Sequence, residues 1–165
     1  MVTSRNIVLL LVVLALAVGS FYFFSPGKEK QVRKQLTRLT EYADKEPAEP
    51  TLTTVAKAAR IGSLFTDPCS LEIENPPMNG SYSRKEVMDR INMTRNYFSQ
   101  LKVSFYDIGI EFPEESRAEV VLTMRVTGKR DNEDYTDTRE VEFTMEKPEK
   151  KWLISRIHLV EVLEQ

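Results

Sequence analysis

The residues best suited to chemistry in this 165-residue chain lie near its C-terminus. His158 is the only histidine of the sequence, and Arg156 stands two positions before it. The surrounding stretch alternates like a β-strand, so the two side chains share one face at a separation of about 6.6 Å. An imidazole can act as an acid or a base near neutral pH, and a guanidinium binds carboxylates and other anions. The pair therefore predicts a ligand-binding position, while no motif assigns a catalytic residue.

Asp107 and Tyr106 form a second candidate ligand-binding position, in another alternating stretch. Counted with period two, Asp107 shares a face with Phe105, and burial in an apolar pocket would suit its carboxylate to proton transfer. Tyr106 could donate a hydrogen bond to a ligand oxygen. The competing interpretation makes Asp107 an ordinary residue of a solvated strand face and Tyr106 an ordinary core ring.

Whether Arg156 and His158 line a pocket depends on which face of the terminal strand packs on the core. One face carries Trp152, Ile154, Arg156, His158, Val160 and Val162, and the other carries Leu153, Ser155, Ile157, Leu159 and Leu163. The second face is at least as apolar, so we expect it to pack on helices. Arg156 and His158 then look outward, toward solvent or a partner. The alternative places them inside a pocket.

Composition excludes several classes of function. Lysine and arginine number 23 against 25 aspartate and glutamate, for a formal net charge of -2, which is not the cationic footprint of a nucleic-acid-binding protein. One cysteine cannot close an intramolecular disulfide, and one cysteine with one histidine cannot build a closed zinc site. We therefore expect no metal, no cofactor and no nucleic-acid partner.

An uncharged apolar segment runs from Ile7 to Phe24. As a helix it would be about 27 Å long, close to the hydrocarbon thickness of a bilayer. We expect an uncleaved signal anchor within residues 1–27, followed by one domain over residues 28–165. The alternative is a cleaved signal peptide, because Ala15 and Ala17 resemble a cleavage site.

The orientation of this segment is open from charge alone. Only Arg5 precedes it, whereas Lys28 and Lys30 follow, and the positive-inside rule would keep the domain in the cytoplasm. An N-terminal apolar segment before a whole domain nevertheless usually serves export. We expect a single-pass protein of the inner (cytoplasmic) membrane with its domain on the periplasmic, extracytoplasmic side.

The rest of the chain divides into helical and extended patterns. Apolar residues at helical spacing predict helices over about 28–45 and from Leu52 to near Gly62, with Pro47 and Pro50 between them. Ser83 and Glu86 have the spacing of a capping box and open a third helix, with an apolar stripe of Val87, Met88, Ile91, Phe98 and Leu101.

The last part of the chain changes to period two. Before the third helix, a short strand is also expected through Cys69, Leu71 and Ile73. Three further strands precede the terminal one: Tyr106, Ile108, Ile110 and Phe112; Val120, Leu122, Met124 and Val126; and Val141, Phe143 and Met145. The stretch TGKRDNEDYTDTR predicts a polar hairpin loop. Four consecutive strands at hairpin spacing predict an antiparallel meander with the three helices on one face, an α+β fold.

This order of elements resembles the nuclear transport factor 2-like superfamily, also called SnoaL-like or cystatin-like. The stretches that carry the resemblance are FTDPCSLEI, NGSYSRKEVMDRI and KKWLISRI, within about residues 29–163. The resemblance implies three helices packed on a curved antiparallel sheet in a cone whose mouth can hold a small ligand. It also implies that two copies can pair through the outer face of the sheet.

The resemblance leaves the activity open, since the superfamily contains both enzymes and binding proteins. We expect a membrane-anchored, non-catalytic module of the cell envelope that binds a small ligand, an envelope protein or a second copy of itself. The alternative is an isomerase- or dehydratase-type enzyme that uses the cone. A carboxylate base facing an oxyanion stabiliser, as in the enzymes, cannot be matched residue by residue.

Overall fold

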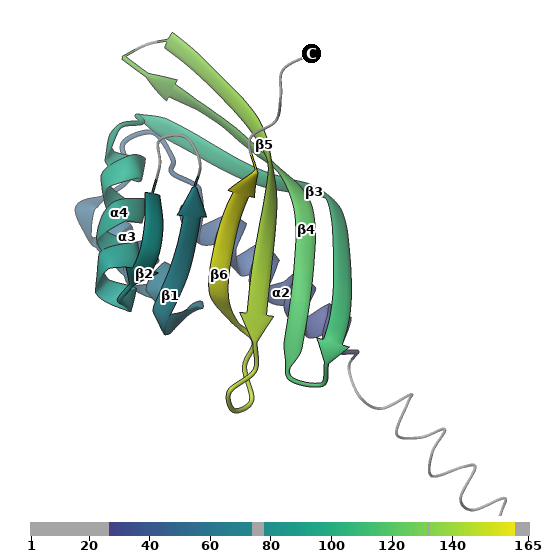
Figure 1. Ribbon diagram of the computed structural model, residues 1–165. Coiled ribbons are helices and arrows are strands. Elements are labelled where there is room, and N and C mark those ends of the chain that lie inside the picture. Colours follow the sequence, from purple (N-terminus) through teal and green to yellow (C-terminus); the bar gives the residue numbers. More distant parts are fainter. Residues whose placement is uncertain (1–26, 74–77, 132, 161–165) are drawn as a thin grey trace, which may run out of the picture. The chain divides into compact units, whose positions relative to one another are not determined.

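The computed structural model describes residues 27–73, 78–131 and 133–160 (Figure 1). Val162 and Leu163, which the sequence places on the terminal strand, lie outside these residues. So does the whole apolar segment from Ile7 to Phe24. Within the described ranges no helix has both the length and the apolar character needed to span a bilayer.

The chain divides into two compact units, residues 1–31 and 32–165. Of the first unit only residues 27–31 are described, and residues 28–31 open the first helix. The second unit contains the rest of that helix and all other elements described below.

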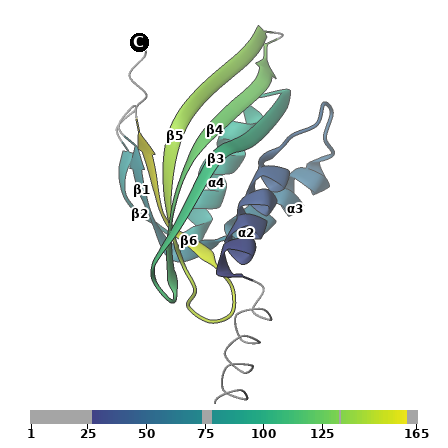
Figure 2. The same cartoon turned by 90° about the vertical axis from the view of Figure 1, so that its right-hand side faces the viewer.

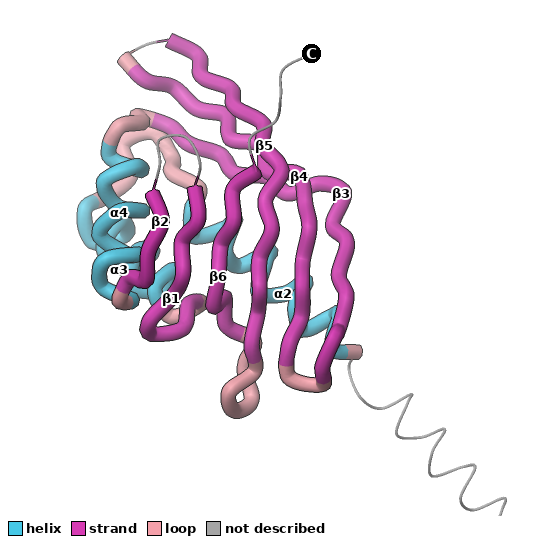
Figure 3. Tube along the Cα trace, in the orientation of Figure 1, coloured by secondary structure: helices cyan, strands magenta, loops and turns pink. Residues whose placement is uncertain are grey.

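Helices and strands follow the order that the sequence predicts, with one strand added (Figure 3). The elements are α2 (Lys28–Ala43), α3 (Thr51–Gly62), β1 (Phe65–Ile73), β2 (Met78–Tyr82), α4 (Arg84–Asn96), β3 (Gln100–Glu114), β4 (Arg117–Arg130), β5 (Glu133–Glu146) and β6 (Leu153–Val160). The added strand is β2. Its sequence, MNGSY, lacks the alternating apolar pattern that predicts a strand.

The strands form one six-stranded sheet in the order β2-β1-β6-β5-β4-β3. Strands β3 to β6 make the expected antiparallel meander. Strand β1 is antiparallel to β2 but parallel to β6, with Leu71 opposite Ile157. The sheet is therefore mixed rather than purely antiparallel, because β1 arrives before the third helix and lies beside the last strand.

Helices α2, α3 and α4 lie on one face of the sheet, which we call the inner face (Figure 2). Their apolar stripes meet the alternating apolar side chains of the strands in one core, which includes Val32 and Leu36 of α2, Ile61 of α3 and Val87 of α4. The predicted capping box opens α4: the Ser83 hydroxyl accepts from the Glu86 N–H, and the Ser83 N–H donates to the Glu86 carboxylate. None of the helices that the structure describes covers the polar outer face (Figure 2).

A β-bulge in β3 changes which residues face inward. The register moves between Tyr106 and Gly109, and Asp107 has a positive φ of 51°. Phe105 packs against the core before the bulge, whereas Ile108 and Ile110 do so after it. Counting with period two through this strand is therefore wrong at Tyr106, which does not share a face with Ile108.

A second bulge in β6 corrects the expected faces of the terminal strand. Ile154 lies opposite Met145 and Arg156 lies opposite Thr144, so Ser155 is an extra residue. Trp152 and Ile154 are consequently buried in the core, although strict alternation groups them with Arg156. After the bulge, Ile157 packs against the core as expected.

The stretch expected to be a hairpin loop is mostly paired strand. Strands β4 and β5 stay in register as far as Arg130 and Glu133. Ring contacts support this extension, because Tyr135 packs on Phe98 at 5.2 Å between ring centroids. The sequence pattern did not predict this pairing, because polar side chains lie on both faces of the hairpin and leave no alternation of apolar and polar residues.

Two glycines of the sheet offer a matched test of this packing. A Cβ on Gly128 would lie 2.5 Å from the carbonyl oxygen of Gln100, whereas a Cβ on Gly109 would have its nearest neighbour at 3.8 Å. We expect Gly128→Ala to lower the free energy of unfolding by about 1–3 kcal/mol, because the backbone of β3 must shift. Gly109→Ala should stay within about 0.5 kcal/mol of the parent.

Urea unfolding followed by the fluorescence of Trp152, the only tryptophan and a buried one, measures both variants. Equal stability of the two variants would contradict the close approach of β3 and β4 at Gly128.

Candidate ligand-binding cavity

A cavity of about 360 Å³ lies between the inner face of the sheet and the helices. This volume is at the small end of ligand-binding pockets in proteins. The sheet side of its wall includes Val103, Phe105, Met124, Val126 and Phe143. Among the residues that the structure describes, all but three of those lining the cavity are hydrophobic, so the cavity favours an apolar occupant.

The three polar lining residues all belong to α4: Arg90, Thr94 and Arg95. The Thr94 hydroxyl donates to the Arg90 carbonyl oxygen of its own helix at 3.0 Å. The Arg90 guanidinium lies over the Tyr82 ring, 4.5 Å from its centroid. The polar part of the cavity is therefore confined to one stretch of one helix.

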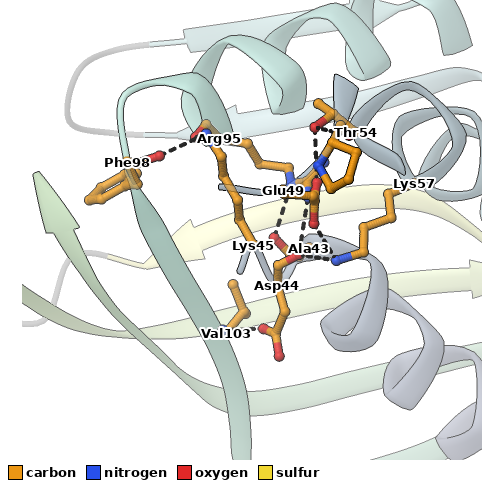
Figure 4. Close-up of polar contacts among 10 residues, drawn as sticks. Ala43, Asp44, Lys45, Glu49, Thr54, Lys57, Arg95, Phe98 and Val103 are labelled. Atoms are coloured by element: carbon orange, nitrogen blue, oxygen red, sulfur yellow. Dashed lines mark hydrogen bonds and ion pairs between the residues drawn. The ribbon is translucent and has the colours of Figure 1, made fainter. Parts of the chain in front are cut away.

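Arg95 is the most deeply buried charged residue that the structure describes, with only 1% of its surface exposed. Its Nε donates to the Ala43 carbonyl oxygen at 3.2 Å, and its Nη2 donates to the Asp44 carbonyl oxygen at 3.0 Å and to Glu49 Oε1 at 2.8 Å (Figure 4). Its Nη1 is buried and has no partner among the residues described. Two nitrogens of the guanidinium, Nε and Nη2, thus donate hydrogen bonds within the protein, whereas Nη1 donates none to the described residues.

Glu49 is the carboxylate that pairs with Arg95, and its side chain is 2% exposed. It also accepts hydrogen bonds from Lys57 at 2.6 Å and Thr54 at 3.0 Å (Figure 4). Burial alone would raise the pKa of Glu49, but the hydrogen bonds from Lys57, Thr54 and Arg95 together hold it below its ordinary value. Glu49 is therefore ionised at neutral pH.

Two lysines and one aspartate complete this group, which we call the Arg95 cluster: Asp44, Lys45, Glu49, Lys57 and Arg95. Lys45 Nζ donates to the carbonyl oxygens of Arg95 and Phe98 at 3.1 and 2.8 Å. Lys57 Nζ donates to the Asp44 carbonyl oxygen at 2.7 Å. The Lys45 bonds join the loop between α2 and α3 to the end of α4, and the Lys57 bond joins α3 to the same loop.

Asp44 carries the second carboxylate of the Arg95 cluster. Its Oδ1 accepts from the Val103 N–H of β3 at 2.8 Å (Figure 4). Burial raises the pKa of Asp44, and the hydrogen bond from Val103 and the charge of Lys102 offset this only in part. The environment of Asp44 therefore raises its pKa, whereas the environment of Glu49 lowers the pKa of that carboxylate.

Arg156 and His158 lie on the outer face, away from the cavity. Arg156 donates to both carboxylate oxygens of Glu72 on β1, and His158 Nδ1 lies 3.0 Å from Glu142 Oε2 on β5. The hydrogen bond from Arg156 lowers the pKa of Glu72. Both side chains therefore join neighbouring strands, and a ligand-binding role for them stays a prediction.

Asp107 and Tyr106 also lie on the outer face, because the bulge turns Asp107 away from Phe105. Both line a shallow depression with Thr123, Arg125, Thr136 and Thr138. The Thr123 hydroxyl lies 3.5 Å from Asp107 Oδ2, and the Tyr106 side chain is 49% exposed. Grouping Asp107 with Phe105 is thus wrong, and β4 and β5 separate this pair from Arg156 and His158.

The residues that do line the cavity were only partly visible in the sequence. The apolar stripe of α4 passes through Val87 and Ile91, and Arg95 stands where the next apolar residue is expected. An arginine on a core stripe was the available signal.

Cys69 is buried, and burial raises the pKa of its thiol to about 11, which does not suit a nucleophile.

Comparison with known proteins identifies the fold. No family model and no curated protein sequence matches the chain. A putative scytalone dehydratase from Novosphingobium aromaticivorans has a similar structure, with a TM-score of 0.68, 14% identity, and coverage of 82% of this chain and 85% of that chain. A hexachlorocyclohexane dehydrochlorinase (LinA) gives a TM-score of 0.65 at 12% identity, covering 80% and 83%.

A third similar structure is a protein of unknown function with a cystatin-like fold from Nostoc punctiforme. Its TM-score is 0.60 at 11% identity, and the match covers 79% of this chain and 88% of that chain. At these identities the likeness shows the fold alone. The chain therefore has the nuclear transport factor 2-like fold, also called cystatin-like, that the order of its elements predicts.

The Arg95 cluster predicts opposite effects for two isosteric substitutions. Glu49→Gln should lower the free energy of unfolding at pH 7 by about 3 kcal/mol, because it leaves Arg95 and Lys57 without a buried counter-charge. Asp44→Asn should keep or raise stability at pH 7, because a carboxyl whose pKa is raised on folding opposes folding when it is ionised.

Urea unfolding between pH 3 and pH 8 measures both effects. The contribution of Glu49 is present above its unfolded pKa of about 4.5 and is lost as the pH falls through its lower folded value. The difference in the free energy of unfolding between the parent and Glu49→Gln should therefore become smaller below about pH 4. A gap that does not change with pH, or a large loss in Asp44→Asn, would refute this assignment of charges.

Proposed function

We propose that this chain is a non-catalytic binding module that holds a small apolar molecule in the cavity. The observation that carries the proposal is the cavity itself, an apolar space of about 360 Å³ whose polar lining residues, among those the structure describes, lie on α4. Apolar pockets with a few convergent polar groups are typical of ligand sites. The fold adds support, because it encloses such a space between its sheet and its helices.

An isomerase- or dehydratase-type enzyme is the second candidate. The observation in its favour is that two of the similar structures carry the names of a dehydratase and a dehydrochlorinase. General acid–base catalysis needs a group that gives or takes a proton within hydrogen-bond reach of the substrate. No carboxylate, histidine, tyrosine or cysteine lines the cavity within the described part of the chain, and arginine does not deprotonate. Binding without turnover therefore has the better support.

One pair of substitutions on β4 tests the binding proposal. Val126 lines the cavity, whereas Val121 lies on the same strand with its side chain exposed on the outer face. Val126→Phe should weaken binding of the neutral apolar dye N-phenyl-1-naphthylamine at least about tenfold, a loss of about 1.4 kcal/mol, because the added ring occupies the cavity. Val121→Phe should leave the affinity unchanged.

Dye fluorescence on titration measures the affinity, and Trp152 fluorescence on heating confirms that both variants are folded. Equal dye binding by both variants would rule out the cavity as the site.

We further propose that the segment from Ile7 to Phe24 holds the module at the inner membrane, with the domain on the periplasmic side. The length of the segment and its lack of charge support insertion into a membrane. The proposed orientation rests on the general tendency of large domains to be translocated regardless of their charge. The full-length chain should stay in the membrane fraction after alkaline carbonate washing, with its intact mass. Alkaline phosphatase fused after Gln165 should be active, because that enzyme folds only outside the cytoplasm.

A chain shortened by its first residues would support the cleaved signal peptide instead. Extraction into the soluble fraction at full mass would refute the anchor, and an inactive phosphatase fusion would refute the orientation. Pairing of two copies through the outer face stays a prediction.

A further inference from the structure

We infer that the ligand of the cavity carries a carboxylate, which accepts a hydrogen bond from Arg95, and a compact apolar body, which packs on the sheet. This inference rests on the proposed binding function and adds the chemical class of the ligand.

The unused nitrogen of Arg95 is the first observation. Arg95 forms part of the cavity wall, and its Nε and Nη2 are already bonded to residues 43–49. Its Nη1 is buried and unpartnered within the described residues. Arg84 Nε, Asn92 Oδ1 and Trp152 Nε1 are also buried without a partner among the described residues, but of these four residues Arg95 alone is among the lining residues of the cavity. Buried polar groups are nearly always hydrogen-bonded, so Nη1 is a donor available to an acceptor in the cavity, from a ligand or a water.

The balance of charge around Arg95 is the second observation. The Arg95 cluster contains three basic side chains, Lys45, Lys57 and Arg95, against the two carboxylates of Asp44 and Glu49. Burial also disfavours the charge on Asp44. The α4 side of the cavity is therefore positive, and a bound anion would balance it better than a neutral group.

The shape of the cavity limits the apolar part of the ligand. The sheet side offers valine, methionine and phenylalanine side chains and no polar lining residue among those described. A volume of about 360 Å³ admits a single ring with a short chain better than a long lipid tail. A monocarboxylate with one ring is thus the class that fits both ends of the cavity.

Three compounds that share one apolar body form the test: 4-phenylbutyrate, 4-phenylbutanamide and 4-phenylbutylamine. They are titrated by calorimetry at pH 7.5 into the full-length chain, held in phosphatidylcholine nanodiscs, with empty nanodiscs as the blank. We expect the carboxylate to bind at least tenfold more tightly than the amide, and the amine to bind most weakly.

Arg95→Lys tests the assignment to this residue. Lysine keeps the positive charge but lacks the planar fork of donors, so the preference for the carboxylate over the amide should fall to twofold or less, while the amide still binds. Arg139→Lys is the control, because Arg139 pairs with Asp137 on the same strand and does not line the cavity. It should keep the full preference.

Each outcome decides the inference. Equal binding of all three compounds would overturn it and leave the proposed binding function intact, as would a preference for the amine. Equal binding is also what an ordered water on Nη1 would produce. Failure of all three to bind, together with failure of the neutral dye, would overturn both. If Arg95→Lys does not fold, the comparison of the three compounds decides alone.

Discussion

The structure depends on the burial of one guanidinium, that of Arg95. A buried charge is unfavourable unless it is paired and hydrogen-bonded, so Glu49 and the carbonyl oxygens of Ala43 and Asp44 must surround it. That requirement fixes the loop between α2 and α3 against the end of α4. The two helices joined by the loop are thereby held over the sheet, and the space that they leave becomes the cavity. Removing the charge would change the packing of three segments at once, not the chemistry of one position.

The two faces of the sheet use polar residues in different ways. On the outer face Arg156 pairs with Glu72 and His158 lies beside Glu142, each across neighbouring strands. These partly exposed pairs are screened by solvent and add little to stability. On the helix side of the sheet, the polar groups of the Arg95 cluster come from α3, α4 and the loop between α2 and α3, and low polarity strengthens their electrostatic interactions. The residue types that suggest chemistry are therefore on the outer face, whereas the enclosed space is on the inner face.

The sequence was sufficient for the order of all helices and strands except β2, because their periodicity is strong, and the capping box at Ser83 and Glu86 marks the start of α4. It failed where one extra residue interrupts a strand. Asp107 and Ser155 each shift the alternation by one, and nothing in their residue types announces a bulge. The same shifts misplaced Tyr106 and Trp152. Arg95 was visible only as an exception in an apolar stripe, and its partners come from a distant loop that no local pattern connects to it.

The parallel pairing of β1 with β6 has a consequence for how the chain reaches this state. Glu72 and Arg156 meet although 84 positions separate them in the sequence, so β1 and β2 emerge from the ribosome long before their neighbour exists. Until β6 is synthesised, one edge of β1 has no strand to bind, and such open edges invite association with other chains. Contacts this distant also slow folding. During synthesis this half-finished sheet therefore needs protection, a role suited to a molecular chaperone.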